Sequence, residues 1–301
     1  MRFIIEQNNE DQRLDVFLSE VIKNASRSKI QMEIKKGKAF VNSNQVKASY
    51  MLKEDDIVDF DFAFIENSLK PISENIPLDI IWEDENMAVI NKPSNMLTHP
   101  TLQEMNGTLV NALLYHYGEN LSNINGDLRR GIVHRLDRNT SGLLMIAKNN
   151  TTHEFLSNEM KLKNFTKKYI AIVKGVIEKD DFLIDLPLGR HLTQPYKQAV
   201  RKDGKESQTY VKVLERFSDA TFIELTLITG RTHQIRVHLS AIGHPVYNDT
   251  LYGFGKMKIK TDEQVLQSYK LEFTKPLTDE RISLEIPPDS KFEKVLNALR
   301  N

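Results

Sequence analysis

The chain of 301 residues contains no cysteine, and this absence excludes several kinds of chemistry. Without cysteine there is no disulfide, no thiolate nucleophile and no cysteine-ligated zinc. Enzymes that methylate RNA through a cysteine, and zinc-dependent deaminases, are therefore excluded. Nucleotide-binding motifs are also missing, because there is no P-loop and no Gly-x-Gly-x-x-Gly follows a predicted strand. The histidines show no metal-ligand pattern, so the sequence predicts neither a metal nor another cofactor.

Long apolar runs are absent as well. No stretch approaches the ~20 apolar residues that a membrane-spanning helix needs. Residues 1–6 run straight into polar ones, so the sequence shows no signal-peptide core. We therefore expect a cytoplasmic protein without a membrane partner. Hydrophobic residues still make up 40% of the chain, which is enough for a packed core.

The chain also lacks an excess of charge of either sign, since 41 basic residues balance 41 acidic ones. The distribution of these charges is nevertheless uneven. Residues 23–53 carry eight lysines or arginines against one acid, and residues 161–174 carry five lysines and no acid. Contact with a phosphate backbone needs local basic zones of this kind, so they favour a nucleic-acid partner. Solvated faces that bind nothing are the alternative interpretation.

The most informative segment that is present is the loop at 131–142, Gly-Ile-Val-His-Arg-Leu-Asp-Arg-Asn-Thr-Ser-Gly. It places Asp137 between two arginines, Arg135 and Arg138. The apolar run 143–147 that follows predicts a buried strand. A carboxylate at the lip of a strand, surrounded by cations, is a candidate nucleophile or base. A surface turn with a solvated ion pair is the alternative.

The length of the chain predicts about two domains. Residues 1–62 form the first, residues 63–77 are a polar linker that contains prolines, and residues 78–301 form the second. Within the first domain, Ser28 is a plausible N-cap and Gly37 a plausible stop for a basic helix. The elements predicted there are helices at 13–22 and 28–37 and short strands at 39–41 and 57–60.

The second predicted domain alternates β-rich segments with a few helices. Residues 79–92 predict a hairpin with its turn near residues 84–86. Residues 221–228 alternate apolar and polar positions, which is the period of a half-buried strand. Apolar spacing predicts a helix that opens at Arg231 and a last helix through 292–299. Clustered strands with few helices predict an α+β fold with a mainly antiparallel sheet.

The string His-Arg-Leu-Asp-x-x-Thr-Ser-Gly at 134–142 resembles the catalytic motif of the pseudouridine synthases of the large ribosomal RNA type, the RluA/RluD family. Three further blocks, at 107–114, 167–175 and 229–239, are similar to that family in the same order. This resemblance implies a catalytic domain with a mainly antiparallel, mixed sheet. Residues 1–62 resemble the small α/β RNA-binding domain of the S-four type, with a generic αβ mini-domain as the alternative.

Enzymes of that family isomerise uridine within RNA, and the reaction needs no cofactor. The resemblance implies that Asp137 is the essential carboxylate, which attacks the anomeric carbon, attacks the uracil ring or deprotonates the sugar. It nominates Arg231 as the cation that holds Asp137, and a phosphate ligand at a helix start is the alternative role for Arg231. A stacked base must be flipped out to be reached. The resemblance implies that Arg135 fills the vacated position and that Tyr169 packs against the uracil, although Tyr169 alone also fits a core aromatic.

The cations near these motifs are predicted to contact RNA. His134 fits an orienting or phosphate-contacting role better than that of a general base. Ribosomal RNA is the favoured partner and transfer RNA the alternative, and we expect a monomer. The predicted RNA-binding residues are Arg27, Lys29, Lys35, Lys36, Lys38, His134, Arg138, Lys167 and Lys168.

Two other functions compete with that of an RNA pseudouridine synthase. A non-catalytic RNA-binding or ribosome-assembly protein would keep the basic domain and lose the active-site carboxylate, but Asp137 is present within its full motif. A nucleosidase or glycosidase would need a second carboxylate close to Asp137. The motif offers arginines there instead, so the isomerase is the function that the sequence predicts.

Overall fold

The computed structural model describes residues 1–22, 25, 27–62, 70–255, 257–278 and 280–301. The chain forms two compact units, Met1–Ser68 and Leu69–Asn301. Part of the predicted linker, residues 63–69, lies outside the described residues, so the predicted domain boundaries remain predictions. Within the described part of the chain, no helix combines the length and the apolar character needed to cross a membrane.

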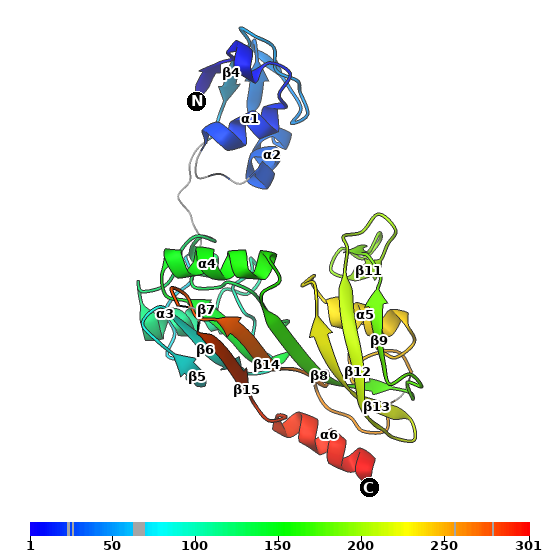
Figure 1. Ribbon diagram of the computed structural model, residues 1–301. Helices are drawn as coiled ribbons and strands as arrows, with labels where there is room; N and C mark the ends of the chain where they lie inside the picture. Colours follow the sequence, from blue (N-terminus) through cyan, green and yellow to red (C-terminus); the bar gives the residue numbers. More distant parts are fainter. Residues whose placement is uncertain (23–24, 26, 63–69, 256, 279) are drawn as a thin grey trace. The chain divides into compact units, whose positions relative to one another are not determined.

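The smaller unit packs two helices against a four-stranded antiparallel sheet of order β1-β4-β2-β3 (Figure 1). Helix α1 buries Leu14 and Leu18, and helix α2 buries Ile30 and Ile34, so each helix turns an apolar stripe of i, i+4 spacing to the sheet. Both predicted helices are confirmed. Ser28 lies inside α2, however, so its prediction as N-cap is wrong. The elements are β1 (Arg2–Ile4), η1 (Gln7–Asn9), α1 (Leu14–Val21), α2 (Arg27–Lys35), β2 (Ala39–Val41), β3 (Asn44–Gln45) and β4 (Ile57–Phe60).

The larger unit is built on one nine-stranded sheet of order β5-β6-β7-β14-β8-β13-β12-β9, with β15 paired to β14. Strands β7 and β14 pair in parallel, and the other neighbours in this sheet are antiparallel. The predicted α+β fold with a mainly antiparallel, mixed sheet is thus confirmed. The strands are β5 (Ile80–Glu83), β6 (Met87–Lys92), β7 (Ser141–Ala147), β8 (Thr166–Lys174), β9 (Asp181–Asp185), β12 (Gln208–Arg216), β13 (Ala220–Leu227), β14 (Leu266–Thr274) and β15 (Arg281–Glu285), with a separate pair β10 (Leu188–Arg190) and β11 (Gln198–Val200).

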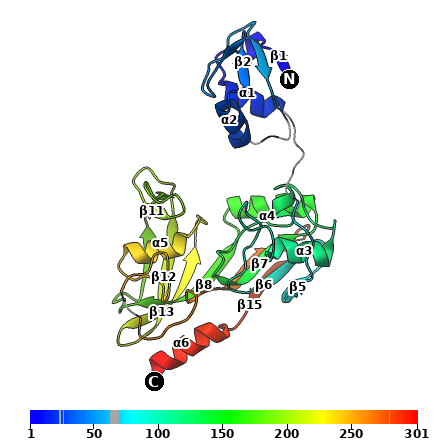
Figure 2. The ribbon, with the colours of Figure 1, turned by 180° about the vertical axis from the view of Figure 1, so that it is seen from behind.

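Helices cover both faces of this sheet, and strand β7 shows the consequence. Leu144 and Ile146 belong to a cluster that includes residues of α3 and α5, whereas Leu143 and Met145 belong to a second cluster that includes Leu156 of α4. Figure 2 shows the ribbons of α3, α4 and α5 beside this sheet. Every residue of β7 is therefore buried, as the apolar run 143–147 predicts. The helices are α3 (Leu109–Tyr117), α4 (Asn150–Lys161), α5 (Gln234–Ala241) and α6 (Ser290–Arg300), with a short 3-10 turn η2 (Asp127–Arg129).

The start of α5 differs from the prediction in a way that changes the site. The helix begins at Gln234, so the predicted start at Arg231 is wrong by almost one turn. The Gln234 side chain accepts hydrogen bonds from the backbone N–H of Arg231 and the hydroxyl of Thr229, both at 2.9 Å. These bonds close a turn before the helix, and Arg231 belongs to that turn. The predicted hairpin at 79–92, the strand at 221–228 and the last helix are confirmed as β5–β6, β13 and α6.

Candidate active site

The loop that carries Asp137 runs from η2 to β7, and its backbone is held by the segment that follows β6. The Thr98 hydroxyl donates to the carbonyl of Leu136 at 2.8 Å and accepts from the Leu136 N–H at 3.3 Å. The ammonium of Lys92, which is fully buried, donates to the carbonyl of Arg138 at 3.1 Å. The residues directly before and after Asp137 are therefore tied to the same segment, which fixes the direction of its side chain.

The carboxylate of Asp137 faces an arginine that is itself clamped from behind. Nη1 of Arg236 lies 2.9 Å from Oδ2 of Asp137. Nε and Nη2 of the same guanidinium donate to the two carboxylate oxygens of Asp249, at 2.7 and 2.9 Å. Asp249 also accepts the backbone N–H groups of Leu251 and Tyr252. Because a bidentate pair fixes the plane of the guanidinium, Asp249 aims Arg236 at Asp137.

Burial on its own disfavours the charged forms of both Arg236 and Asp249. Hydrogen bonding to Asp249 and the charges of Asp249 and Asp137 outweigh burial and raise the pKa of Arg236 above its ordinary value. Likewise burial would raise the pKa of Asp249, but the bonds and charge of Arg236 lower it. Arg236 and Asp249 are both charged at neutral pH, so a fixed positive charge faces Asp137.

His233 places a second polar group beside the same carboxylate. The Gln198 N–H donates to the Tyr252 hydroxyl at 2.9 Å, which leaves the hydroxyl proton free to bind Nδ1 of His233 at 2.8 Å. In that arrangement Nε2 carries the imidazole proton. Nε2 lies 3.9 Å from Oδ2 of Asp137. Burial lowers the pKa of His233, which favours the neutral ring. His233 also has a left-handed φ of +56°, an uncommon conformation that the turn before α5 imposes.

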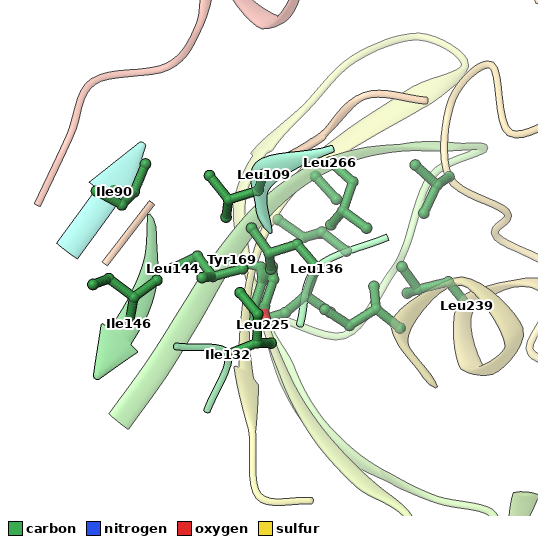
Figure 3. Close-up of a cluster of buried hydrophobic side chains, with 14 of the residues drawn as sticks. Ile90, Leu109, Ile132, Leu136, Leu144, Ile146, Tyr169, Leu225, Leu239 and Leu266 are labelled. Atoms are coloured by element: carbon green, nitrogen blue, oxygen red, sulfur yellow. The ribbon is translucent and has the colours of Figure 1, made fainter. Parts of the chain in front are cut away.

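These groups open onto a cavity of about 360 Å³. Its volume lies in the ~300–1,000 Å³ range of sites for small ligands, so it has room for a group of the size of a nucleobase. Tyr169 is 5% exposed and contributes to the wall from within an apolar cluster that includes Leu136 and Leu266 (Figure 3). The polar and charged lining residues are His134, Arg135, Asp137, Thr140, Lys167, Tyr169, Arg231, Thr232, His233, Gln234 and Arg236.

The cavity brings together every residue that the sequence nominated for the reaction, but one partnership is wrong. Arg236, and not Arg231, holds Asp137. The reason is the late start of α5, which leaves Arg231 in the preceding turn, where its Nε donates to the carbonyl of Glu206 at 3.1 Å. Arg135 is exposed, and it has no hydrogen bond or ion pair to any residue that the structure describes.

Among the residues predicted to contact RNA near the cavity, Lys168 and Arg138 are paired with acids, whereas Lys167 has no ion pair within the described residues. Lys168 forms an ion pair with Glu224 at 3.0 Å, and Arg138 forms one with Glu104. His134 accepts the backbone N–H of Met145 through Nε2 at 3.1 Å. Burial, helped by the charge of Lys167, lowers the pKa of His134 to about 3, so this histidine is neutral and suits the orienting role.

In the smaller unit, acids of the same unit neutralise part of the predicted basic face. Arg27 pairs with Asp15 at 3.0 Å, and Lys36 and Lys38 pair with Glu33 at 2.7 and 2.9 Å. Lys29 lies 5.8 Å from the centre of the Phe62 ring. Lys35 is exposed and has no ion pair within the described residues.

Several residues of the site were not found by sequence reasoning. His233 and Arg236 are the exceptions that the sequence could have supplied, since both stand in the same block as Arg231. The missed residues that lie outside the motifs at 131–142 and 229–239 carry no local sequence signal of their role. In the described ranges no group of three or more histidines and acids is placed to hold a metal ion. The site residues that sequence reasoning missed are Lys92, Thr98, His233, Arg236, Asp249 and Tyr252.

Comparison with known proteins gives consistent matches. Residues 86–241 match the family model described as RNA pseudouridylate synthase, and residues 12–58 match the S4 domain model. The chain is 42% identical to an uncharacterized RNA pseudouridine synthase of Bacillus subtilis, over 98% of this chain and 97% of that protein. It is 35% identical to a ribosomal large subunit pseudouridine synthase D of Nitrosomonas europaea, over 96% and 85% of the two chains. The human protein RNA Pseudouridylate Synthase Domain Containing 1 shares the fold, with a TM-score of 0.59 at 24% identity over 76% of this chain and 96% of the human one.

Proposed function

This chain belongs to the RNA pseudouridylate synthase family, and we propose that it converts specific uridines of large-subunit ribosomal RNA to pseudouridine with Asp137 as the essential carboxylate. Family membership makes the protein an RNA pseudouridine synthase, an isomerase that acts on RNA and carries an N-terminal S4 domain. The choice of Asp137, the flipping of the base and the ribosomal target are the parts that we propose.

The observation that carries the proposal is the Asp137–Arg236 pair at the cavity. The isomerisation breaks the glycosidic bond, turns the uracil and rejoins it through C5, so no atom is gained or lost. A single fixed carboxylate next to the sugar suits this reaction. A glycosidase uses two working carboxyl groups, one of them protonated. Asp249 does not fill that second role, because it is buried and both its oxygens are occupied by Arg236 and backbone N–H groups.

The other lining residues support a flipped uridine in this cavity. A uridine that remains stacked cannot reach Asp137, so it must leave the helix or loop that contains it. Arg135 is exposed beside Asp137 and takes the place of the base in the RNA. Tyr169 packs its ring against the uracil, as aromatic side chains commonly do in RNA recognition. The Nε2–H of His233 and the guanidinium of Arg236 hold polar atoms of the nucleotide near Asp137.

Two observations favour ribosomal RNA over transfer RNA as the substrate. The relative from Nitrosomonas europaea is named for the ribosomal large subunit and aligns over 96% of this chain. The S4 domain adds a second unit with an exposed lysine, Lys35, that has no ion pair within the described residues. Binding by two units favours a large structured RNA.

The direct experiment measures release of tritium from RNA labelled at C5 of uracil, because the new bond at C5 expels that hydrogen. The RNA comes from cells that lack this protein, with ribosomal and transfer RNA assayed separately. We expect release from ribosomal RNA by the wild type and none by Asp137→Asn. Asp180→Asn is the matched control, since Asp180 also pairs with an arginine but its side chain is 84% exposed. Activity of Asp137→Asn would refute the role of Asp137, and release from transfer RNA alone would refute the substrate.

A further inference from the structure

A second cavity adjoins the first and has no part in the chemistry described above. It is open to solvent and has a volume of about 510 Å³. One side is formed by the end of α4 and the start of β8, and the other by the end of β13 and the turn that precedes α5. The two cavities are continuous, because the same residues line both: Met160, Lys167, Leu227, Gly230 and Arg231.

The second cavity is lined by four cations, Lys161, Lys163, Lys167 and Arg231, and by no aspartate or glutamate. None of the four forms an ion pair with any residue that the structure describes, and the guanidinium of Arg231 donates to the carbonyl of Glu206. Lys168, next in sequence to Lys167, is by contrast paired with Glu224. Gathered like charges repel one another, and a cleft lined by one sign of charge attracts a ligand of the opposite sign. The cavity is therefore suited to a polyanion.

Lys167 occupies the boundary between the two cavities. Burial lowers its pKa below the ordinary lysine value, and no carboxylate acts in the opposite direction. Its charge also contributes to the lowered pKa of His134 on the side of the first cavity. An anion placed at this boundary would stabilise the charged form of Lys167.

The remaining lining residues match the other parts of a nucleotide. Met160 and Leu227 are half-buried and offer apolar surface to a base. Hydroxyl groups that can bind sugar or phosphate oxygens come from Thr166 and Thr226.

We propose that the second cavity binds the nucleotide next to the target uridine in single-stranded RNA, with one phosphate against Lys167 and Arg231 and the next against Lys161 and Lys163. This inference rests on the proposed function, since continuity with the uridine cavity is what makes the occupant a neighbouring nucleotide. The cavity thereby adds a site for recognition of the sequence or backbone beside the modified position.

The test compares two full-length double variants that remove the same charge. Lys161→Gln/Lys163→Gln alters the cavity, and Lys179→Gln/Lys294→Gln alters exposed lysines elsewhere that have no ion pair within the described residues. The probe is large-subunit ribosomal RNA transcribed in vitro, used for filter binding over a range of salt and for steady-state tritium release. We expect the cavity variant to raise KM and Kd roughly tenfold with kcat within about twofold. Because Lys161 and Lys163 share one phosphate, the slope of log affinity against log salt should fall by about 0.7. The control variant should match the wild type.

A second measurement locates the contact once the modified uridine has been mapped. Short RNAs carry a neutral methylphosphonate in place of one phosphate on either side of that uridine. On one side the substitution should weaken binding to the wild type about tenfold and have little effect on the cavity variant, because the partner cations are already gone. The subsite would be overturned if the two double variants changed Kd and KM equally, or if neither changed them. It would also be overturned if the methylphosphonate weakened binding to the wild type and to the cavity variant equally. Absence of tritium release by the wild type would instead refute the isomerase proposal, and the binding data would still decide the subsite.

Discussion

Substitution of Arg236 by methionine separates the structural from the catalytic role of the Asp137–Arg236–Asp249 arrangement. Methionine has a similar length but no charge, so it leaves the buried carboxylate of Asp249 with only the N–H groups of Leu251 and Tyr252. Loss of one partner of a buried ion pair costs about 3–5 kcal/mol. For a unit of this size each kcal/mol lowers Tm by about 2–4 °C. We therefore expect Arg236→Met to melt well below the wild type at pH 7.

The pH dependence of that loss follows from Asp249. In the wild type its pKa is lowered, so its stabilising contribution is present above the unfolded value of about 3.9 and is lost as the pH falls through the folded value. Without Arg236, burial dominates and raises the pKa of Asp249 above the unfolded value. The destabilisation of Arg236→Met should then be largest at neutral pH and shrink as the pH falls toward 4. Urea unfolding followed by circular dichroism at pH 7 and pH 4.5 measures both effects.

A second substitution provides the control. In Arg236→Met/Asp249→Asn, the asparagine oxygen still accepts the two N–H groups and no unpaired charge is buried, so most of the stability should return. Tritium release should stay roughly 100- to 1,000-fold below the wild type in both variants, because Asp137 has lost the group that faces it. A loss below about 1 kcal/mol at pH 7, or a double variant as unstable as the single one, would refute this reasoning.

Two further predictions concern the loop around Asp137. Thr98→Val leaves the N–H and carbonyl of Leu136 without their partner, so we expect the free energy of unfolding to fall by about 1–3 kcal/mol. We also expect kcat to fall with KM for RNA nearly unchanged. An unaltered kcat, measured against the exposed control Thr278→Val, would contradict the role of Thr98. His134 has a folded pKa of about 3, so its contribution to stability is complete above the unfolded value of about 6.5 and falls by about 2 kcal/mol between pH 7 and pH 5. His134→Gln, which can still accept the Met145 N–H, should lack that acid-dependent loss in urea unfolding, and equal losses in both proteins would contradict the assignment.

The sequence by itself determined the features that depend on local pattern. The apolar spacing of α1 and α6, the alternation along β13 and the buried run of β7 were all readable, because period and burial are set by nearby residues. The loop around Asp137 was also readable, since its chemistry lies in consecutive residues. The local patterns were sufficient for the α+β fold, and the class of reaction was implied by the resemblance of this loop and three further blocks to a known family.

The tertiary structure alone decided which side chains meet. Arg231 and Arg236 lie in one block, and their roles depend on where α5 begins, which the side chain of Gln234 sets by closing the preceding turn. Asp249 reaches Arg236 from beyond the helix, and Thr98 reaches the loop of Asp137 from a segment 38 residues away in sequence. Such contacts depend on the register of strands and the rotation of helices, which long-range packing sets and local periodicity does not encode.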